Sequence, residues 1–374
     1  MLFFIAVFIV YFLINTYIFL KGWKALNPSF AAKFIYCLIF FVFFSSFSLA
    51  MLLRNSLPLP FLKPIYFIGT TWLAATLYLS LYFILTDFVK FLDKKIYFLP
   101  GKWRRNPRLF FRLQVISGYS ILLVLLLYGY YHYSHPEIVR QNISIAKQAG
   151  NRKELKVVGI SDLHLGISVD KKSLAKYVKL INEQKPDVVI ISGDLIDNNL
   201  RPLVEEKMWE EINQLNAPLG VFMCLGNHEY LSDIEESLTF LKKTKINLLI
   251  DRTMFVGESF YVAGRDDKMN KDRKELNEIL SDVDPSYPII LLNHQPYGLE
   301  EAEIDGIDLQ FSGHTHNGQL FPLNLIVKNI FEICYGYKQK GNTHYYISSG
   351  LALWGPPYRI GTQSELVVFD IQFK

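Results

Sequence analysis

Four long apolar stretches in the first third of the chain constrain its fold more than any other feature. They hold 19 to 22 residues each and contain no Asp, Glu, Lys or Arg: residues 2–20, 34–53, 65–86 and 113–133. A helix needs about 20 apolar residues to cross the hydrocarbon core of a bilayer, where its backbone polar groups must pair within the helix. We therefore expect residues 1–133 to form a membrane domain of four transmembrane helices, followed by a second domain over residues 134–374.

The same stretches are compatible with two alternatives. The first stretch could be a signal peptide, but it lacks the basic leading region and the small-residue cleavage site of one, so we interpret it as a retained helix. All four stretches could instead be buried core helices of a soluble protein.

Lys and Arg are distributed unevenly between the loops of this region. Residues 1–133 hold 13 of the 39 Lys and Arg residues but only two of the 35 acidic residues. Eleven of the thirteen lie in the loops after the first and third stretches: Lys21, Lys24, Lys33, Lys90, Lys94, Lys95, Lys102, Arg104, Arg105, Arg108 and Arg112. The positive-inside rule places such loops in the cytoplasm. We therefore expect an integral protein of the cell membrane whose C-terminal domain lies on the extracytoplasmic side.

The same basic residues allow two interpretations of the 90–112 segment. It either sets the topology alone or also binds anionic lipid head groups. Residues 134–374, by contrast, carry more acidic than basic side chains, which excludes a uniformly basic nucleic-acid binder. No nucleic-acid partner is predicted.

The last 240 residues alternate apolar, β-branched runs with helical patterns. Expected strands cover residues 138–146, 155–160, 188–191, 221–225, 260–263, 289–292, 309–311, 345–348 and 365–372, and expected helices cover 171–182, 202–215 and 234–242. Strands that alternate with helices predict an α/β layered domain.

Five of the expected strands are followed at once by side chains that can bind a metal ion. In chain order these side chains are Asp162 and His164, Asp194 and Asp197, Asn227 and His228, His294, and finally His314 and His316. Sites in open α/β sheets form beyond the carboxyl ends of the strands, so we expect these groups to meet. Oxygen and nitrogen donors without thiolate suit Mn, Fe or Zn, and two such ions can clamp both oxygens of a phosphoryl displacement.

Each of these motifs is weak on its own. A D-x-H pair is common by chance, G-D-x-x-D and G-N-H-E also suit turns, and the histidines of H-x-H could simply be polar loop residues. Their occurrence together, each after an apolar run, favours a metal site with two divalent ions.

The ordered motifs resemble those of the calcineurin-like metallophosphoesterases, and the run from Gly313 to Gln319 resembles the YkuE/YaeI-like branch. This resemblance covers residues 138–374 and implies a four-layer α/β/β/α sandwich. It also implies ligand sets: Asp162, His164 and His316 for one ion, Asn227, His294 and His314 for the other, and Asp194 as the bridge. His228 would donate to a phosphate oxygen or protonate the leaving oxygen, and Asp197 would orient His228.

Two arginines are candidate substrate-binding residues. Arg359 lies in a Pro-x-Arg segment like that of the branch, and Arg265 follows an expected strand, although a solvated turn is the simpler interpretation of Arg265. A guanidinium group matches phosphate with a planar fork of donors. Asn198 stands where the protein phosphatases of this superfamily have Arg, and Asn317 where the branch usually has glycine.

The sequence thus predicts a membrane-anchored metal-dependent phosphoesterase acting on a phosphodiester, phosphomonoester or pyrophosphate. A lipid-linked substrate is one hypothesis, because the anchor keeps the domain close to lipid head groups, and a soluble phosphate ester is another. The alternative to an enzyme is a non-catalytic transport or scaffold protein with a phosphoesterase-like binding domain.

Overall fold

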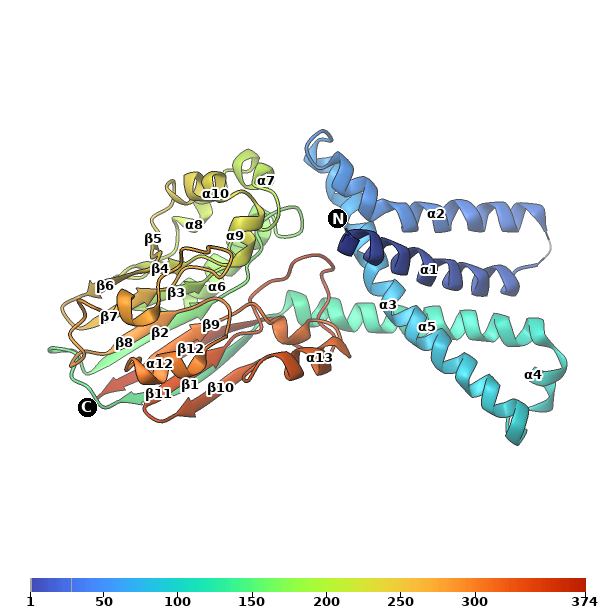
Figure 1. Cartoon of the computed structure of the whole chain (residues 1–374). Coiled ribbons are helices and arrows are strands. Elements are labelled where there is room, and N and C mark those ends of the chain that lie inside the picture. The colour runs from blue at the N-terminus through green and yellow to red at the C-terminus, as the bar shows by residue number, and fades with distance from the viewer. Residues whose placement is uncertain (1, 28) are drawn as a thin grey trace. The chain divides into compact units, whose positions relative to one another are not determined.

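The chain forms two compact units, Met1–Tyr130 and Tyr131–Lys374, in a computed structural model that describes residues 2–27 and 29–374 (Figure 1). The predicted domain boundary, between residues 133 and 134, lies a few residues beyond the division between the units. Each unit is described separately below.

The first unit consists of helices. They are α1 (Leu2–Ala25), α2 (Phe30–Leu53), α3 (Leu59–Ile96), α4 (Gly101–Arg105) and α5 (Pro107–Ser134), the last of which runs into the second unit. The helices α1, α2, α3 and α5 are long and apolar enough to cross a membrane. The α3 helix has 38 residues and extends well beyond the apolar stretch predicted at 65–86, until Tyr97 takes a left-handed conformation with φ of 57°.

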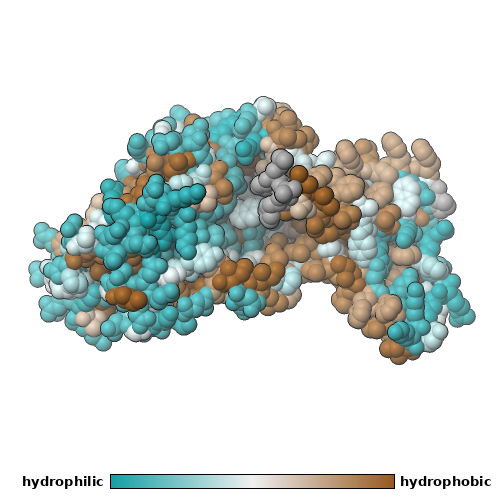
Figure 2. All heavy atoms as spheres, viewed as in Figure 1, coloured by the Kyte–Doolittle hydropathy of each residue, from teal (hydrophilic) through white to brown (hydrophobic). Residues whose placement is uncertain are grey.

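Large apolar side chains in this unit point outward. Leu52 is 80 % exposed, and Phe41, Ile84 and Val124 are also exposed. Figure 2 shows the resulting hydrophobic surface over these helices and a mostly hydrophilic surface over the second unit. Exposed apolar side chains on long helices are unfavourable in water and favourable in the hydrocarbon core of a bilayer.

The second unit is built on two six-stranded sheets. The first has the strand order β1 (Glu137–Ile145), β12 (Glu365–Phe373), β2 (Glu154–Ile160), β3 (Val188–Ser192), β4 (Val221–Cys224) and β5 (Asn247–Leu248). The second has the order β10 (Gly336–Lys340), β11 (Thr343–Ile347), β9 (Leu309–Ser312), β8 (Ile289–Leu292), β7 (Phe260–Gly264) and β6 (Arg252–Val256). β2, β3 and β4 are parallel neighbours, as are β7, β8 and β9.

The helices of this unit are short apart from the first. They are α6 (Lys171–Glu183), α7 (Arg201–Glu205), α8 (Trp209–Ile212), α9 (Asn227–Leu231), α10 (Ile234–Leu241), α11 (Leu276–Ile279), α12 (Leu299–Ile304) and α13 (Leu323–Ile330), with a 3₁₀ turn at His316–Gly318. The prediction of a single helix over residues 202–215 is wrong. The structure has two short helices there, α7 and α8, because Lys207 between them adopts a left-handed φ of 51° that an α-helix does not accommodate.

Three apolar clusters separate the layers. Alternate residues of a strand face opposite sides of a sheet, so Val158 packs against α6 and α10, whereas its neighbour Val157 packs against the second sheet. On β8 the buried Ile290 faces the first sheet and Leu291 faces α12. The predicted four-layer α/β/β/α sandwich is therefore confirmed, with α8 and α10 beyond one sheet and α12 beyond the other (Figure 1).

Candidate metal centre

Five strands end at one edge of the sandwich, and each is followed by predicted ligands. β2, β3 and β4 of the first sheet lead to Asp162, Asp194 and Asn227. β8 and β9 of the second sheet lead to His294 and to the His314 turn. Since the strands within each set are parallel, their carboxyl ends lie side by side, and the two sheets bring residues separated by up to about 150 positions together.

The predicted ligands form groups that could each hold a metal ion. The groups are Asp162 with His164 and His316, His164 with Asp194 and His228, and Asp194 with His294 and His314, and within each group the ligand atoms lie within 4.8 Å of one another. Asp194 belongs to two of these groups. That position suits the bridging role that the family resemblance implies.

Distances in the first group place imidazole nitrogens around one carboxylate. His316 Nε2 lies 3.5 Å from Asp162 Oδ1. His164 Nε2 lies 3.9 Å from the same oxygen and 3.3 Å from His316 Nε2. All three side chains are buried.

The other group is centred on Asp194 and Asn227. Asp194 Oδ2 lies 3.1 Å from His294 Nε2 and 3.8 Å from His164 Nε2 of the first group. Asn227 Oδ1 lies 2.8 Å from His314 Nδ1 and 3.1 Å from His294 Nε2. His294 Nδ1 donates to the Ser192 carbonyl at 2.8 Å, which leaves Nε2 as the nitrogen that faces the ligands.

The backbone at these positions is strained. Asp162, His164, Asp194, His314 and His316 all have φ between 46° and 70°. A left-handed conformation costs roughly 1–2 kcal/mol in a residue other than glycine. Such strain gathers at sites where side chains must be aimed for function.

Two glycines allow the strand ends to approach one another. A Cβ on Gly226 would lie 2.3 Å from Asp194 Oδ1, and a Cβ on Gly313 would lie 2.4 Å from Asp162 Oδ2. Any side chain at either position would displace a carboxylate.

Glu229, the last residue of G-N-H-E, has a role that the sequence did not reveal. Its carboxylate is buried and accepts hydrogen bonds from the backbone N–H groups of Asp194 (3.0 Å), Ile196 (3.0 Å) and Gly226 (2.7 Å). It therefore ties the end of β3 to the end of β4. Burial, followed by the charge of Asp194, raises the pKa of Glu229 to about 7.

Three of the candidate imidazole ligands are in the protonation state that suits metal binding. Burial lowers the pKa of His164 to about 4 and that of His314 to about 3, and it also lowers the pKa of His316. These imidazoles are neutral at pH 7, as metal ligands must be. Burial acts in the same direction on His294, but the adjacent Asp194 carboxylate outweighs it and raises the pKa of His294 to about 10.

The donor set fits divalent ions. Within residues 2–27 and 29–374, no Lys or Arg nitrogen lies within 4.0 Å of the Asp162 or Asp194 carboxylate. The positive charge beside these two buried acids therefore comes from the protons that His294 and His228 hold. A metal ion can replace such protons as the source of positive charge.

His228 and Asp197 lie beside these ligands. His228 Nδ1 is 3.4 Å from Asp197 Oδ1. Although burial lowers the pKa of His228, the contact with Asp197 and the charge of Asp194 raise it above its ordinary value overall. His228 is thus placed to hold a proton next to the ligand groups.

The two arginines predicted to bind substrate make hydrogen bonds and ion pairs within the protein. Arg359 is fully buried and donates to the backbone carbonyls of His316, Ser349, Gly350 and Ala352 at 2.5–3.0 Å. Its guanidinium holds the loop that carries His316, an arrangement that does not favour direct contact with substrate.

Arg265 is engaged in a similar way. It is 4 % exposed and pairs with Glu301 at 2.6 Å and with Glu275 at 3.3 Å. Its predicted phosphate contact would have to displace these acids.

The fold and the site together define a class: a layered α/β phosphoesterase domain with a candidate dinuclear metal centre, preceded by apolar helices. The sequence model of the calcineurin-like phosphoesterase family matches residues 155–318. An uncharacterized metallophosphoesterase of Campylobacter jejuni is 32 % identical over 389 residues, which cover 100 % of this chain and 99 % of that protein. The chain therefore belongs to the calcineurin-like metallophosphoesterase family.

Two further relatives show how the parts combine elsewhere. The metallophosphoesterase YkuE of Bacillus subtilis is 30 % identical over 66 % of this chain and 90 % of its own length. A transmembrane protein with metallophosphoesterase domain of Danio rerio is 32 % identical over 68 % of this chain and 61 % of its own length. A membrane segment joined to such a domain thus recurs in a distant relative.

Proposed function

We propose that this protein is a membrane-anchored phosphoesterase that uses two divalent metal ions. The observation that carries the proposal is the position of Asp194, which belongs to two ligand groups at once. One carboxylate shared between two groups is the arrangement required to hold two ions a few ångströms apart. Mn, Fe or Zn suits the mixed oxygen and nitrogen donors.

In this proposal the protein supplies both the binding and the proton chemistry. Bound divalent ions provide Lewis acidity, which activates a water and neutralises negative charge on the phosphate ester. Asp162, His164 and His316 would hold one ion, and Asn227, His294 and His314 the other. His228, kept protonated beside Asp197, would donate to a phosphate oxygen or to the leaving oxygen.

Removal and return of the metal test the reaction class. The purified full-length protein with Mn²⁺ is expected to hydrolyse a chromogenic aryl phosphodiester or monoester. Treatment with a chelator should abolish hydrolysis, and added Mn²⁺ should restore it. Hydrolysis that persists at the same rate without metal, or metal loading with no hydrolysis of any phosphate ester, would instead favour the non-catalytic scaffold.

We further propose that the substrate is a lipid-linked phosphate ester. Five large apolar side chains in the segments around the His316 turn and the Trp354 loop are exposed, and we call this set the apolar rim: Phe321, Leu325, Ile326, Ile330 and Trp354. The α13 helix contributes three of these residues and directly follows the metal-ligand turn. An apolar patch beside a phosphate-binding site suits a substrate that has both a phosphate and an acyl chain.

Two elements fix the rim next to the centre. The Phe331 ring, at the end of α13, has its centroid 6.0 Å from that of His314. The Trp354 ring lies 6.4 Å from that of His228, and the Trp354 carbonyl accepts from Gln319 at 3.4 Å. A bound acyl chain would therefore lie within reach of the reacting phosphate.

A double substitution separates lipid from soluble substrates. Leu325→Ser with Ile326→Ser should lower kcat/KM for a phospholipid phosphodiester about tenfold, which corresponds to part of the burial energy of two side chains, and should leave an aryl phosphodiester unaffected. The matched control is Val204→Ser with Ile304→Ser, which removes two exposed apolar side chains from other helices. Equal losses for both pairs, or full activity on soluble esters with none on lipids in the wild type, would count against a lipid-linked substrate and favour a soluble phosphate ester.

The orientation proposed for the protein is the one that the loop charges favour, with the phosphoesterase domain outside the cell membrane. A reporter that is active only in the cytoplasm, fused after Lys374, should remain silent. Reporter activity would reverse the orientation without affecting the proposed chemistry.

A further inference from the structure

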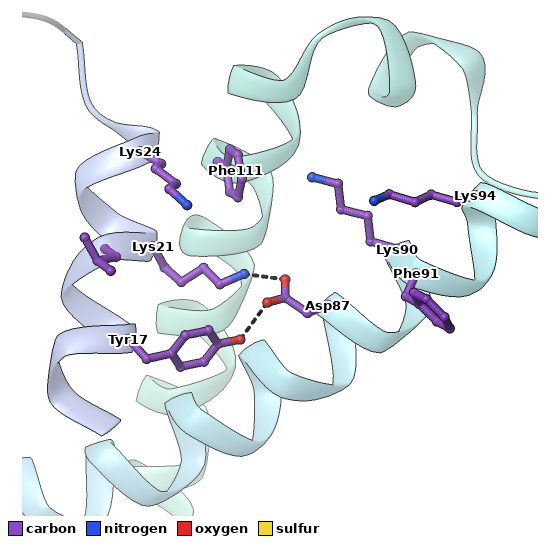
Figure 3. Close-up of a pocket in the computed structure, with 9 residues that line it drawn as sticks. Tyr17, Lys21, Lys24, Asp87, Lys90, Phe91, Lys94 and Phe111 are labelled. Carbon is purple, nitrogen blue, oxygen red and sulfur yellow. Dashed lines mark hydrogen bonds and ion pairs between the residues drawn. The ribbon is translucent and has the colours of Figure 1, made fainter. Parts of the chain in front are cut away.

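A pocket of about 300 Å³ lies within the first unit, between α1, α3 and α5 (Figure 3). Its lining consists of Tyr17, Leu20, Lys21, Lys24, Asp87, Lys90, Phe91, Lys94 and Phe111. Four of these nine residues are lysines and only one is an acid. The volume is sufficient for several water molecules or for a phosphate group.

The single acid is already paired. Lys21 is 6 % exposed and forms an ion pair with Asp87, whose other oxygen accepts from the Tyr17 hydroxyl at 2.8 Å. Gln114 also donates to Asp87, at 3.3 Å. The Asp87 carboxylate is therefore occupied and neutralises only Lys21.

The other three lysines lack such a partner. In the described part of the chain, no carboxylate oxygen lies within 4.0 Å of the ammonium groups of Lys24, Lys90 or Lys94. Figure 3 shows these ammonium groups pointing into the space between the helices. The pocket therefore has an uncompensated positive charge, which an anion can neutralise.

Aromatic rings position two of these lysines. The Lys90 ammonium lies 4.6 Å from the ring centroids of both Phe110 and Phe111. The Lys24 ammonium lies 5.7 Å from the Phe111 centroid. Cation–π contacts of this kind hold flexible side chains in place, so that the charges are grouped before any ligand arrives.

The pocket lies at the boundary between apolar and basic sequence. Its lining begins at Tyr17, about two turns before the end of α1, and on α3 at Asp87, just after the apolar stretch 65–86, and it includes Phe111 near the start of α5. Leu20, which is exposed, ends the apolar stretch of α1, and the exposed Phe91 lies on α3 beside Lys90. The phosphate of a membrane lipid lies at this level, with its acyl chains beside the apolar helix surface.

We propose that this pocket binds the phosphate head group of an anionic phospholipid. Lys24, Lys90 and Lys94 neutralise the phosphate as point charges, Lys21 and Asp87 form the polar floor, and Leu20 and Phe91 contact the first part of the acyl chains. The site is separate from the metal centre, and the proposal does not depend on the phosphoesterase activity.

Native mass spectrometry of the full-length protein in detergent tests the proposal, with phosphatidylglycerol and phosphatidylcholine as the probes. Wild type should retain phosphatidylglycerol in preference to phosphatidylcholine. Lys24→Gln with Lys90→Gln should weaken phosphatidylglycerol binding about thirtyfold, from a factor of about five for each lysine near a membrane surface. Lys24→Arg with Lys90→Arg should restore binding.

The matched control is Lys95→Gln with Lys102→Gln, which removes the same charge from exposed lysines outside the pocket. The control should bind as wild type does. Equal losses in both double variants, or equal retention of the two lipids by wild type, would overturn the proposal. If the Lys24 and Lys90 variant does not fold, Lys94→Gln alone should show a fivefold loss, and an unchanged affinity would count against the site.

Inorganic phosphate distinguishes a lipid from a free anion. It should fail to displace phosphatidylglycerol at millimolar concentration, because it lacks the acyl chains that Leu20 and Phe91 contact. Displacement by phosphate, together with phosphate binding in the absence of lipid, would identify a soluble anion as the occupant and overturn the lipid assignment.

Discussion

The two units bury ionisable groups in opposite ways. In the membrane unit the buried Lys21 pairs with Asp87 and the buried Asp93 pairs with Arg104, and many large apolar side chains face outward. In the phosphoesterase unit the apolar side chains fill three inner clusters, and buried acids and imidazoles gather at one edge of the sandwich. The first pattern suits a lipid solvent, and the second concentrates carboxylates whose charge a bound metal ion can balance.

Asp194→Asn should cause the largest effect. The substitution retains the shape of the side chain but removes the negative charge shared by two ligand groups. We expect a loss of kcat on the order of a thousandfold, equivalent to about 4 kcal/mol of transition-state stabilisation. Steady-state hydrolysis of an aryl phosphate ester measures this loss, and a variant with the kcat of wild type would contradict a role of Asp194 in both ligand groups.

Gly226→Ala tests how closely the strand ends must approach. The added Cβ would lie 2.3 Å from Asp194 Oδ1, so the carboxylate must shift. A displacement of about 1 Å at a reacting centre lowers activity roughly a hundredfold. Gly306→Ala is the control, since its Cβ would meet nothing within 4 Å although φ is 71° there. Comparable losses of activity in both variants would mean that general instability, and not the carboxylate, explains the result.

Asp87→Asn should affect the membrane unit alone. It leaves the buried Lys21 ammonium without its counter-charge, and we expect the unfolding free energy of that unit to fall by about 2–3 kcal/mol. Thermal unfolding in detergent measures the change, and Asp282→Asn, at an exposed position, is the control. Hydrolysis by the folded variant should stay within about twofold of wild type. A thousandfold loss there would show that the two units are coupled.

The sequence pointed to the candidate ligand residues because each follows an apolar run and carries a distinctive side chain. Examples are Asp162, Asp194 and His294, each of which lies two residues after the end of a buried strand. The order of layers could also be predicted, since alternate residues such as Val157 and Val158 must each find an apolar neighbour.

Other features could not be predicted, for reasons that are physical. A buried arginine that donates to backbone carbonyls, such as Arg359, has the same sequence signature as one that binds phosphate. The break at Lys207 depends on tertiary packing, which outweighs helix propensity. The strands β5, β6 and β10 were missed because their residues are largely half-buried or exposed and lack a continuous apolar run.

The most direct test of the two-ion centre is the metal content of the purified full-length protein, measured by inductively coupled plasma mass spectrometry beside Asp194→Asn. The account predicts two divalent ions for each wild-type chain and a clear deficit in the variant, because Asp194 serves both ligand groups. A wild-type protein that binds no divalent ion after loading with Mn²⁺, Fe²⁺ or Zn²⁺, or a variant with the same content as wild type, would contradict it.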